Sequence, residues 1–363
     1  PCSARRSPAG ARWRRGGGIH RRAPSAGSAN DDVGGHLVLS GANTFSGGVT
    51  LSEGNIGLGS SSVVDVDNVT ILSSPLGTGT LTYNPPASPV APFGWGAIYA
   101  VGGPRTIANP IVFASVNGDT TQEALTLDGA HALTFSGTIT LDQTAFLSGI
   151  RVNTASAAMT GDIGGSGGLL KLGPGTLTLS GNNSYGGETV ISGGTLLAQG
   201  ASPTSYGNVT IASGGTLGGT GTINGVTTNQ AGGSIAPGLA SSVGTLSFAS
   251  DLYISGNLSI DVNRSLAQSN DVISVSGTLL NSGSGIVTVN NLGPALAVGN
   301  RFVLFNKPLA GGNTMTVTGG GATWANNLAT DGSITVTGLA PETPPTISSV
   351  TSSGGNLIFS GTN

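Results

Sequence analysis

The 363-residue chain contains very little charge. Charged residues make up 8% of it, against roughly 25% in an ordinary globular domain. From residue 31 onward, six Lys and Arg residues stand against 16 Asp and Glu residues, a formal balance of −10. Nucleic-acid-binding surfaces are built from Lys and Arg that neutralise phosphates. The acidic body therefore argues against a nucleic-acid partner.

Cysteine, histidine and long apolar runs are scarce as well. The only cysteine is Cys2, which excludes an internal disulfide and a cysteine-based zinc site. His20, His36 and His131 do not have the spacing of metal ligands. No apolar run approaches the roughly 18 residues of a membrane-spanning helix, and no segment keeps a 3.6-residue apolar period. We therefore expect no cofactor, no metal, no membrane span and almost no helix.

Glycine is abundant, with 63 residues, and lies between short apolar runs. Val, Ile and Leu alternate with Thr and Ser in LTLS, TVIS, NVTI and SITV, a pattern typical of strands. Clusters such as GNNSYGG, ISGGT and NSGSG mark the turns between them. The pattern predicts an all-β protein.

Two stretches of the chain repeat each other. Leu37–Tyr83 and Leu177–Ile223 align without a gap, and 17 of 47 positions are identical. Such repetition of short strand-and-turn units is typical of a solenoid, because each unit buries its apolar face against the next. The connections favour a coil that returns parallel to itself, since they are too short for helical crossovers. We predict a single parallel solenoid over 34–338, with about 12–15 coils of roughly 20–25 residues.

The two ends of the chain differ from this pattern. Residues 1–33 hold seven of the 13 cationic residues and no apolar period, so we expect a disordered basic tail. Residues 339–346 contain PETPP, which predicts a Pro-rich linker, and 347–363 are interpreted as the truncated start of a further β-module. Because the chain begins at Pro1 rather than Met, we expect a fragment or a misassigned start, with any secretion signal outside it.

The segment Asn84–Pro110 interrupts the rhythm with six prolines. Because proline cannot donate to a sheet ladder, we expect this segment to leave the coil as a loop. Phe93, Trp95 and Tyr99 are the candidate ligand-binding residues of that loop, because aromatic side chains are common anchors at interfaces. The alternative interpretation is that the three rings fold back and shield a flank of the solenoid.

The stretch Gly173–Gly200 reads GPGTLTLSGNNSYGGETVISGGTLLAQG, and five residues of the first copy occupy matching places: Gly41, Asn43, Phe45, Gly47 and Leu51. Glu53 replaces Gly193. This set resembles the autotransporter-associated β-strand repeat of bacterial surface and secreted proteins, and the likeness covers most of 34–338. The resemblance implies a right-handed, single-stranded parallel β-helix. It also implies an extracellular place at a bacterial cell surface, associated with the outer membrane in the full-length protein. It supplies no common catalytic residues.

Two short patterns suggest catalysis or metal binding, each with a plainer interpretation. Gly164–Gly168 matches the G-x-S-x-G nucleophile elbow around Ser166. That elbow requires a helix after the serine, whereas the strand-like LLKLG follows here, so a chance match is favoured. Asp65 and Asp67 would face one side of a strand, as a calcium site or an acid–base pair. A lone DVD supplies too few oxygens for calcium, so a solvated surface pair is favoured.

Four further aspartates would form a glycan-cleaving site if the stacked coils brought them to one face: Asp119, Asp128, Asp142 and Asp162. Arg105 and Arg151 are their nearest cationic partners. The sequence does not decide whether the four converge.

Asn43 and Asn183 occupy equivalent turn positions in the two copies. They either contact a ligand or serve the turn by bonding the local backbone and tolerating a left-handed conformation, and the structural interpretation is favoured. Trp324, in TWANN, is interpreted as a core or capping residue rather than a ligand platform.

Together these features favour a non-enzymatic extracellular repeat protein with a structural or adhesive role in display at a bacterial surface. Its expected partners are glycans or host and matrix surface molecules. The alternatives are a β-helix polysaccharide-active enzyme, either a lyase or a hydrolase, and a glycan-binding module. Clustered carboxylates with an Arg in one groove would favour the enzyme, and a smooth neutral groove would favour the structural role.

Overall fold

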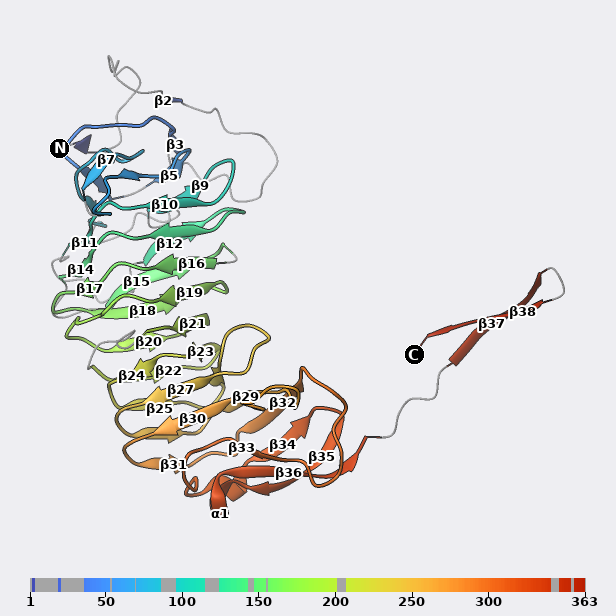
Figure 1. The fold of residues 1–363 in the computed structure, drawn as a ribbon. Helices are drawn as coiled ribbons and strands as arrows, with labels where there is room; N and C mark the ends of the chain where they lie inside the picture. Colours follow the sequence, from blue (N-terminus) through green and yellow to red (C-terminus); the bar gives the residue numbers. More distant parts are fainter. Residues whose placement is uncertain are drawn as a thin grey trace.

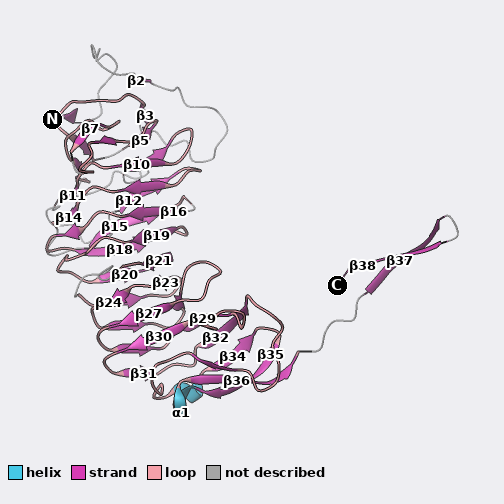
Figure 2. Ribbon diagram, in the orientation of Figure 1, coloured by secondary structure: helices cyan, strands magenta, loops and turns pink. Residues whose placement is uncertain are grey.

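The computed structural model describes residues 2–3, 19–20, 36–52, 54–68, 70–85, 96–114, 124–142, 147–154, 156–200, 207–340, 346–353 and 356–362. The described residues up to 340 form a long stack of coils (Figure 1) that consists almost entirely of strands and turns (Figure 2). The described helical segments are η1 (Gly312–Thr314) and α1 (Leu328–Asp331). No helix in the described ranges is long and apolar enough to span a bilayer. The all-β prediction is confirmed.

The solenoid has three faces. The long face is a 12-stranded sheet with the spatial order β2 (Ile19–His20), β3 (His36–Leu39), β5 (Asn55–Leu58), β9 (Ala97–Ala100), β12 (Ala124–Asp128), β15 (Leu147–Val152), β18 (Gly168–Leu172), β20 (Thr189–Ile191), β22 (Val209–Ile211), β25 (Thr227–Asn229), β28 (Leu252–Ile254) and β31 (Leu279–Asn281).

The second face is a ten-stranded sheet: β10 (Arg105–Ile107), β13 (Leu133–Phe135), β16 (Ser156–Met159), β19 (Thr176–Leu179), β21 (Gly194–Ala198), β23 (Gly215–Gly219), β26 (Ser234–Pro237), β29 (Asn257–Val262), β32 (Ile286–Asn291) and β34 (Thr316–Gly319). The third face is formed by a six-stranded and a three-stranded sheet: β1 (Cys2–Ser3), β4 (Val49–Leu51), β8 (Leu81–Tyr83), β11 (Ile111–Phe113), β14 (Ile139–Leu141) and β17 (Ile163–Gly164), then β24 (Thr222–Ile223), β27 (Thr245–Phe248) and β30 (Val272–Val275). Apart from β2, successive strands of these sheets pair in parallel, so the parallel β-helix is confirmed.

Coil length varies more widely than the sequence predicts. A short coil separates the register partners Val209 and Thr227, and a coil more than twice as long separates Asn55 and Ala97. The long coil contains the antiparallel pair β6 (Val63–Val64) and β7 (Ile71–Ser73). Only the strands must stay in register, so such excursions are tolerated between them.

The two sequence copies form the same local unit on different faces. In the first copy Leu37 of β3 pairs with Ile56 of β5, and in the second Leu177 of β19 pairs with Leu196 of β21. The same length of chain separates the partners in both copies. The first pair belongs to the long sheet and the second to the ten-stranded sheet. The repeat therefore encodes one turn of coil rather than a fixed face.

Inward side chains of successive coils stack into apolar columns. One column of the long sheet has the cross-strand order Leu125, Ile150, Lys171, Ile191, Ile211, Asn229, Ile254 and Asn281. All eight are buried, and each buried Leu or Ile contributes roughly 1.5–3 kcal/mol. Three members of this column are polar: Lys171, Asn229 and Asn281.

Lys171 links two coils through hydrogen bonds to backbone carbonyl oxygens. Its Nζ donates to the carbonyl oxygens of Leu172 (2.9 Å), Gly173 (3.0 Å) and Gly193 (3.0 Å), the last of which belongs to the next coil. Burial, with a smaller contribution from the positive charge of Arg151, lowers the pKa of Lys171 to about 8.

The two asparagines of this column, Asn229 and Asn281, also donate hydrogen bonds to the backbone at the corner between the long sheet and the ten-stranded sheet. Nδ2 of Asn281 donates to the carbonyl oxygens of Gly283 and Gly311, both at 2.9 Å. Nδ2 of Asn229 donates to the carbonyl oxygen of Asn257 at 3.1 Å. Each asparagine thus bonds the backbone of the following coil, as Lys171 does.

A ladder of glycines lies at the same corner, one immediately before or at the start of each of six strands of the ten-stranded sheet: Gly175, Gly194, Gly215, Gly233, Gly256 and Gly285. We call this ladder the glycine corner. A Cβ built on Gly194 would lie 2.5 Å from the carbonyl oxygen of Gly175, and one on Gly285 would overlap that of Gly256. The coils approach here too closely for any side chain, which explains the glycines of the recurring SGGT motif.

The C-terminal end of the stack is closed by an antiparallel sheet of β33 (Arg301–Val303), β36 (Ser333–Leu339) and β35 (Ala322–Asn327). Trp324 of β35 donates its indole N–H to the carbonyl oxygen of Gly319 at 3.0 Å, and its ring lies 6.0 Å from that of Phe302. It packs against the core, so the interpretation of Trp324 as a core or capping residue is confirmed.

Most of the predicted tail 1–33 and of the predicted linker 339–346 lies outside the described residues, whereas most of 347–363 is described. Two dipeptides of the predicted tail are described as strands, with β1 paired to β4 and β2 paired to β3. Residues 341–345 of the predicted linker are outside the description. Beyond them, β37 (Thr346–Ser353) and β38 (Asn356–Thr362) form an antiparallel hairpin. The proposed domain boundaries at 33, 338 and 346 stay predictions.

Candidate ligand-binding groove

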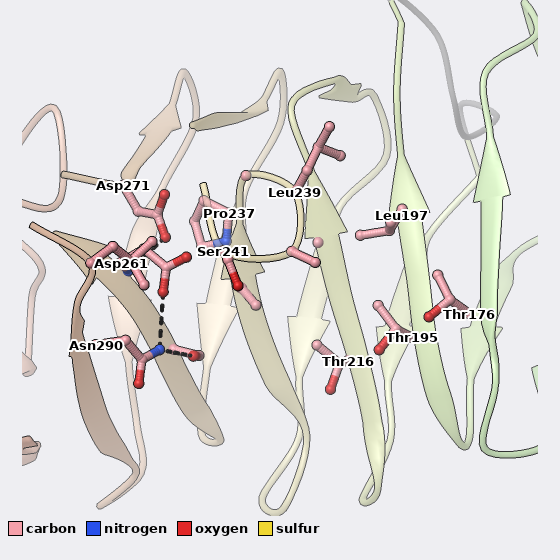
Figure 3. Close-up of a pocket in the computed structure, with 16 residues that line it drawn as sticks. Thr176, Thr195, Leu197, Thr216, Pro237, Leu239, Ser241, Asp261, Asp271 and Asn290 are labelled. Atoms are coloured by element: carbon pink, nitrogen blue, oxygen red, sulfur yellow. Dashed lines mark hydrogen bonds between the residues drawn. The ribbon is translucent and has the colours of Figure 1, made fainter. Parts of the chain in front are cut away.

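A groove of about 360 Å³ lies on the outer surface of the ten-stranded sheet (Figure 3). Its floor is a row of threonines from adjacent strands, Thr176 of β19, Thr195 of β21 and Thr216 of β23, which are cross-strand partners. The residue after each threonine is a buried leucine that points inward: Leu177, Leu196 and Leu217. Strand alternation therefore places hydroxyls on the floor and leucines in the core.

The centre of the groove is lined by residues with little or no side chain. Gly218 and Ala236 are cross-strand partners at its base, with Leu197 beside Gly218. A Cβ on Gly218 would lie 2.7 Å from the carbonyl oxygen of Ala236, so β23 and β26 stack closely here. Leu239, 41% exposed, contributes an apolar wall.

The 237–244 loop that carries this wall is fixed by its own backbone. Gly238 and Gly219 exchange two backbone hydrogen bonds of 2.9 Å. Gly238 has φ +85, and a side chain there would overlap the carbonyl oxygen of Ser242. The tight turn is completed by Ser241, one of the described non-glycine residues with positive φ. The wall of the groove is therefore preformed.

Two aspartates and an asparagine form the polar end of the groove. Asp271 is 1% exposed, and its carboxylate accepts the backbone N–H groups of Gly244 (2.7 Å) and Asp261 (2.8 Å). The Asp261 carboxylate accepts a 3.0 Å hydrogen bond from Nδ2 of Asn290, which also donates to Oγ of Ser259 at 3.2 Å. Asp271 thus ties the loop to the sheet, while Asp261 and Asn290 lie at the groove surface (Figure 3).

Burial raises the pKa of Asp271 to about 7, although the two backbone hydrogen bonds lower it in part. The negative charge of Asp261 adds a smaller upward contribution. The folded protein therefore binds a proton at Asp271 in a pH range where the unfolded chain does not.

We predict that this proton makes stability fall as the pH rises toward about 7. The folded-state pKa lies above the unfolded value of 3.8, so the stabilising contribution is complete below that value and is lost as the pH passes the folded pKa. Thermal midpoints measured between pH about 5.5 and about 8 should decline in the native chain and decline less in Asp271→Asn. Asp142→Asn, a change of the same kind at an exposed position, should keep the native slope. A native midpoint that rises over this range would contradict the prediction.

The aspartates singled out in the sequence do not form a site. Asp65 and Asp67 lie in the turn between β6 and β7 rather than side by side on a strand, so that expectation is wrong. Asp65 accepts the N–H of Val66 at 2.7 Å, and Asp67 accepts the N–H of Thr70 at 2.9 Å. Both are exposed, as the solvated-pair interpretation requires. Their carboxylates stabilise the turn.

The other aspartates lie at different corners of the solenoid. Asp128 ends β12 of the long sheet, Asp142 follows β14, and Asp162 precedes β17. Asp128 therefore lies at the end of the long face, whereas Asp142 and Asp162 lie at opposite ends of strands of the third face. These three aspartates do not converge on one face. Asp119 lies outside the described residues.

Among the residues that the structure describes, Arg105 and Arg151 form no ion pair with these aspartates. Nη2 of Arg105 donates to the carbonyl oxygen of Val101. Arg151 is the cross-strand partner of Thr126 in the long sheet. The glycan-cleaving arrangement is therefore not assembled by the residues that the structure describes.

Ser166 is exposed in the turn between β17 and β18. A strand follows it, whereas a nucleophile elbow requires a helix. The chance interpretation of this G-x-S-x-G match agrees with the geometry. Within the described ranges, no group of three or more His, Cys, Asp or Glu side chains is placed to hold a metal ion.

Tyr99 lies in β9 of the long sheet and not in a loop. Its ring packs over Gly57, where a Cβ would lie 2.8 Å from it, and sits 6.2 Å from the ring of His36. The expected loop is therefore shorter than Asn84–Pro110, because the apolar run AIYAV continues the coil. Phe93 and Trp95 lie outside the described residues.

The equivalent asparagines bond backbone groups, as the structural interpretation predicts, but these groups belong to another part of the solenoid rather than to the local turn. Asn43 Nδ2 donates to the carbonyl oxygen of Pro75 at 2.9 Å, and Asn183 Oδ1 accepts the N–H of Ile163 at 2.9 Å. Both are buried. The expected left-handed conformation is wrong, because the described non-glycine residues with positive φ are Asn68 and Ser241.

Sequence reasoning missed the residues of the groove. The alternation in LSIDV was sufficient to place Asp261 outward on a strand, but nothing in the sequence linked it to Asn290 or to the 237–244 loop. Those contacts depend on the lengths of the coils that bring Ser234 beside Asn257 and Asp261 beside Asn290. Coil length varies along the chain, so no fixed repeat period identifies these pairs.

The family profile of the passenger-associated-transport-repeat matches residues 34–56 and 169–198. The second match extends from β18 to β21 and includes Lys171, Gly175 and Gly194. The chain carries autotransporter passenger repeats. The glycine corner is thus partly built from passenger repeat sequence, and the resemblance inferred from the motifs is confirmed.

Two curated relatives contain similar segments. The Adhesin BmaC autotransporter of Brucella suis biovar 1 (strain 1330) is 36% identical over 110 residues, which cover 30% of this chain and 3% of the adhesin. An extracellular serine protease of Serratia marcescens is 38% identical over 123 residues, 34% of this chain and 11% of the protease. The chain thus spans a small part of either relative. The passenger repeats and these relatives indicate a surface-exposed or secreted passenger segment of an outer-membrane protein.

Proposed function

We propose that this segment is a non-enzymatic, adhesive part of a surface-displayed passenger. The observation that carries the proposal is the preformed groove on the outer face of a rigid stack of passenger repeats. A stacked solenoid holds its surface groups in fixed positions, so little ordering is needed when a ligand binds. The partial similarity to an adhesin supports the same role.

The carboxylates of the groove support binding rather than turnover. The Asp271 carboxylate is buried and accepts two backbone N–H groups, so it is engaged in holding the loop. A general acid must reach the glycosidic oxygen. The polysaccharide-active alternative therefore has one accessible carboxylate in this groove, Asp261, where a glycosidase uses two.

We expect the full chain to bind to arrays of glycans or matrix proteins and to show no turnover of pectin, alginate, simple esters or casein. Casein is included because the Serratia relative is a protease. Turnover that is lost in Asp261→Asn or Ser166→Ala would overturn the non-enzymatic assignment. Absence of binding to every surface tested would leave a passive spacer and overturn the adhesive one.

The aromatic segment with Phe93, Trp95 and Tyr99 is a second proposed binding element. The packing of Tyr99 over Gly57 favours the shielding role for that ring. Trp95→Ala separates the two roles, because lost stability with unchanged binding supports shielding and unchanged stability with lost binding supports a ligand contact.

A further inference from the structure

We propose that the groove beside the 237–244 loop binds an uncharged sugar unit of a glycan, with Asp261 and Asn290 as its polar anchors. The inference rests on the proposed adhesive function and names its site and ligand class. It is drawn from the mixture of groups that line the groove and from their fixed geometry.

The polar end of the groove combines donors and acceptors. The Asp261 carboxylate and the Asn290 amide oxygen supply acceptors, since both N–H groups of Asn290 are engaged with Asp261 and Ser259, and the hydroxyls of Ser259 and Ser241 supply donors. A metal cation would select acceptors alone, and an anion would select donors alone. Sugar hydroxyls donate and accept at once, so they match this set.

The polar anchors are held in place before a ligand arrives. The hydrogen bonds from Asn290 Nδ2 to Asp261 (3.0 Å) and to Ser259 (3.2 Å) fix the carboxylate and the carboxamide relative to each other across β29 and β32. Asp271 fixes the backbone of Asp261 from behind. Preorganised planar groups of this kind bind adjacent hydroxyls with little loss of side-chain entropy.

The apolar part of the groove suits the C–H faces of a sugar ring. Leu197, Ala236 and Leu239 line the surface next to the polar end. The volume of about 360 Å³ lies at the small end of the range for small-molecule sites, which corresponds to a short stretch of a chain. No aromatic ring is among the described residues that line it, so the apolar contact comes from aliphatic side chains alone.

Charge selects against acidic glycans. Asp261 and Asp271 are the ionisable residues that line the groove, and the body of the chain carries a formal balance of −10 from residue 31 onward. A uronate or sialic acid carboxylate would face like charge at short range. The ligand is therefore a neutral sugar.

The test titrates the full chain with neutral oligosaccharides of glucose, xylose, mannose and N-acetylglucosamine, and with oligogalacturonate and oligoalginate, followed by NMR or calorimetry. We expect binding to at least one neutral series and none to the acidic ones. Ala236→Phe, which fills the groove from an outward position, should weaken that binding by about tenfold or more. Asp261→Asn should weaken neutral binding, because charge-assisted hydrogen bonds to the carboxylate are stronger than bonds to a neutral amide, and it should reduce the discrimination against the acidic series.

Asp142→Asn is the matched control, since it removes an exposed carboxylate outside the groove and should change neither property. Thermal midpoints of all variants show whether each one folds. Neutral binding that Ala236→Phe leaves intact in a folded protein would overturn the groove assignment while leaving the adhesive function standing. Preferential binding of the acidic series would overturn the ligand class. Absence of binding to any glycan or matrix surface would overturn both proposals.

Discussion

Alanine in place of Gly285 will destabilise the solenoid by about 3 kcal/mol. The added Cβ would overlap the backbone carbonyl oxygen of Gly256 in the preceding coil. A carbonyl in a sheet-flanking turn cannot rotate away as a side chain can, so the two coils must separate. Their separation would strain the pairing of β29 with β32, which includes Asp261↔Asn290. Denaturant unfolding measured by circular dichroism checks the prediction.

Gly164→Ala is the matched control for this substitution. Gly164 lies in β17, its φ is not positive, and the nearest atom to an added Cβ is Oγ of Ser184 at 3.7 Å. The change should therefore be neutral or should stabilise by about 0.5 kcal/mol, because alanine restricts the unfolded chain. Equal destabilisation by the two substitutions would show that the glycine corner is not set by the close approach of coils.

The strands were predictable because their signal is local. Alternation of apolar and polar residues marks a strand wherever it occurs, and the gapless alignment of the two copies showed that one unit recurs. In the structure, equivalent positions of the two copies form equivalent pairs, Leu37↔Ile56 and Leu177↔Leu196. The parallel stack also followed, because units of this length cannot bury an apolar face alone.

The position of each unit around the solenoid was not predictable, because it depends on the summed lengths of the excursions between strands. The groove is a consequence of those lengths, since it arises where Gly218 and Ala236 come into register beside the 237–244 loop. The prediction that Asn84–Pro110 leaves the coil as a loop was wrong for Tyr99, which lies in β9. No proline lies between Pro92 and Pro104, and the strand β9 fits into that interval.

Lys171 shows how an isolated strand can mislead. In GLLKLG, alternation places Leu170 and Leu172 on one side and Lys171 on the other, so an outward lysine is the natural expectation. The register with Ile150 and Ile191 places Lys171 in the inward column instead. Three backbone carbonyl oxygens at the turn accept its ammonium group, and that feature exists only after the coils have stacked.

Lys171→Met, which keeps the length and apolar stem of the side chain, should destabilise the protein by about 2 kcal/mol at neutral pH. The carbonyl oxygens of Leu172, Gly173 and Gly193 would lose their ammonium donor, and the link between two coils would be lost with it. Arg264→Met, a change at an exposed cationic position, should alter stability by less than about 0.5 kcal/mol.

The pH dependence distinguishes the loss of this buried ammonium from a general packing effect. Because burial lowers the pKa of Lys171 from 10.5 to about 8 in the folded protein, the unfolded chain binds more protons between those values. Native stability therefore gains from Lys171 as the pH rises through that range. Methionine cannot titrate, so the stability difference between the native chain and Lys171→Met should widen from pH about 8 to about 10. Arg264→Met is the matched control, and its stability difference from the native chain should not change over the same pH range. A difference for Lys171→Met that narrows over this range would show that the lysine is more easily charged in the folded protein than in the unfolded chain. That result would contradict the prediction.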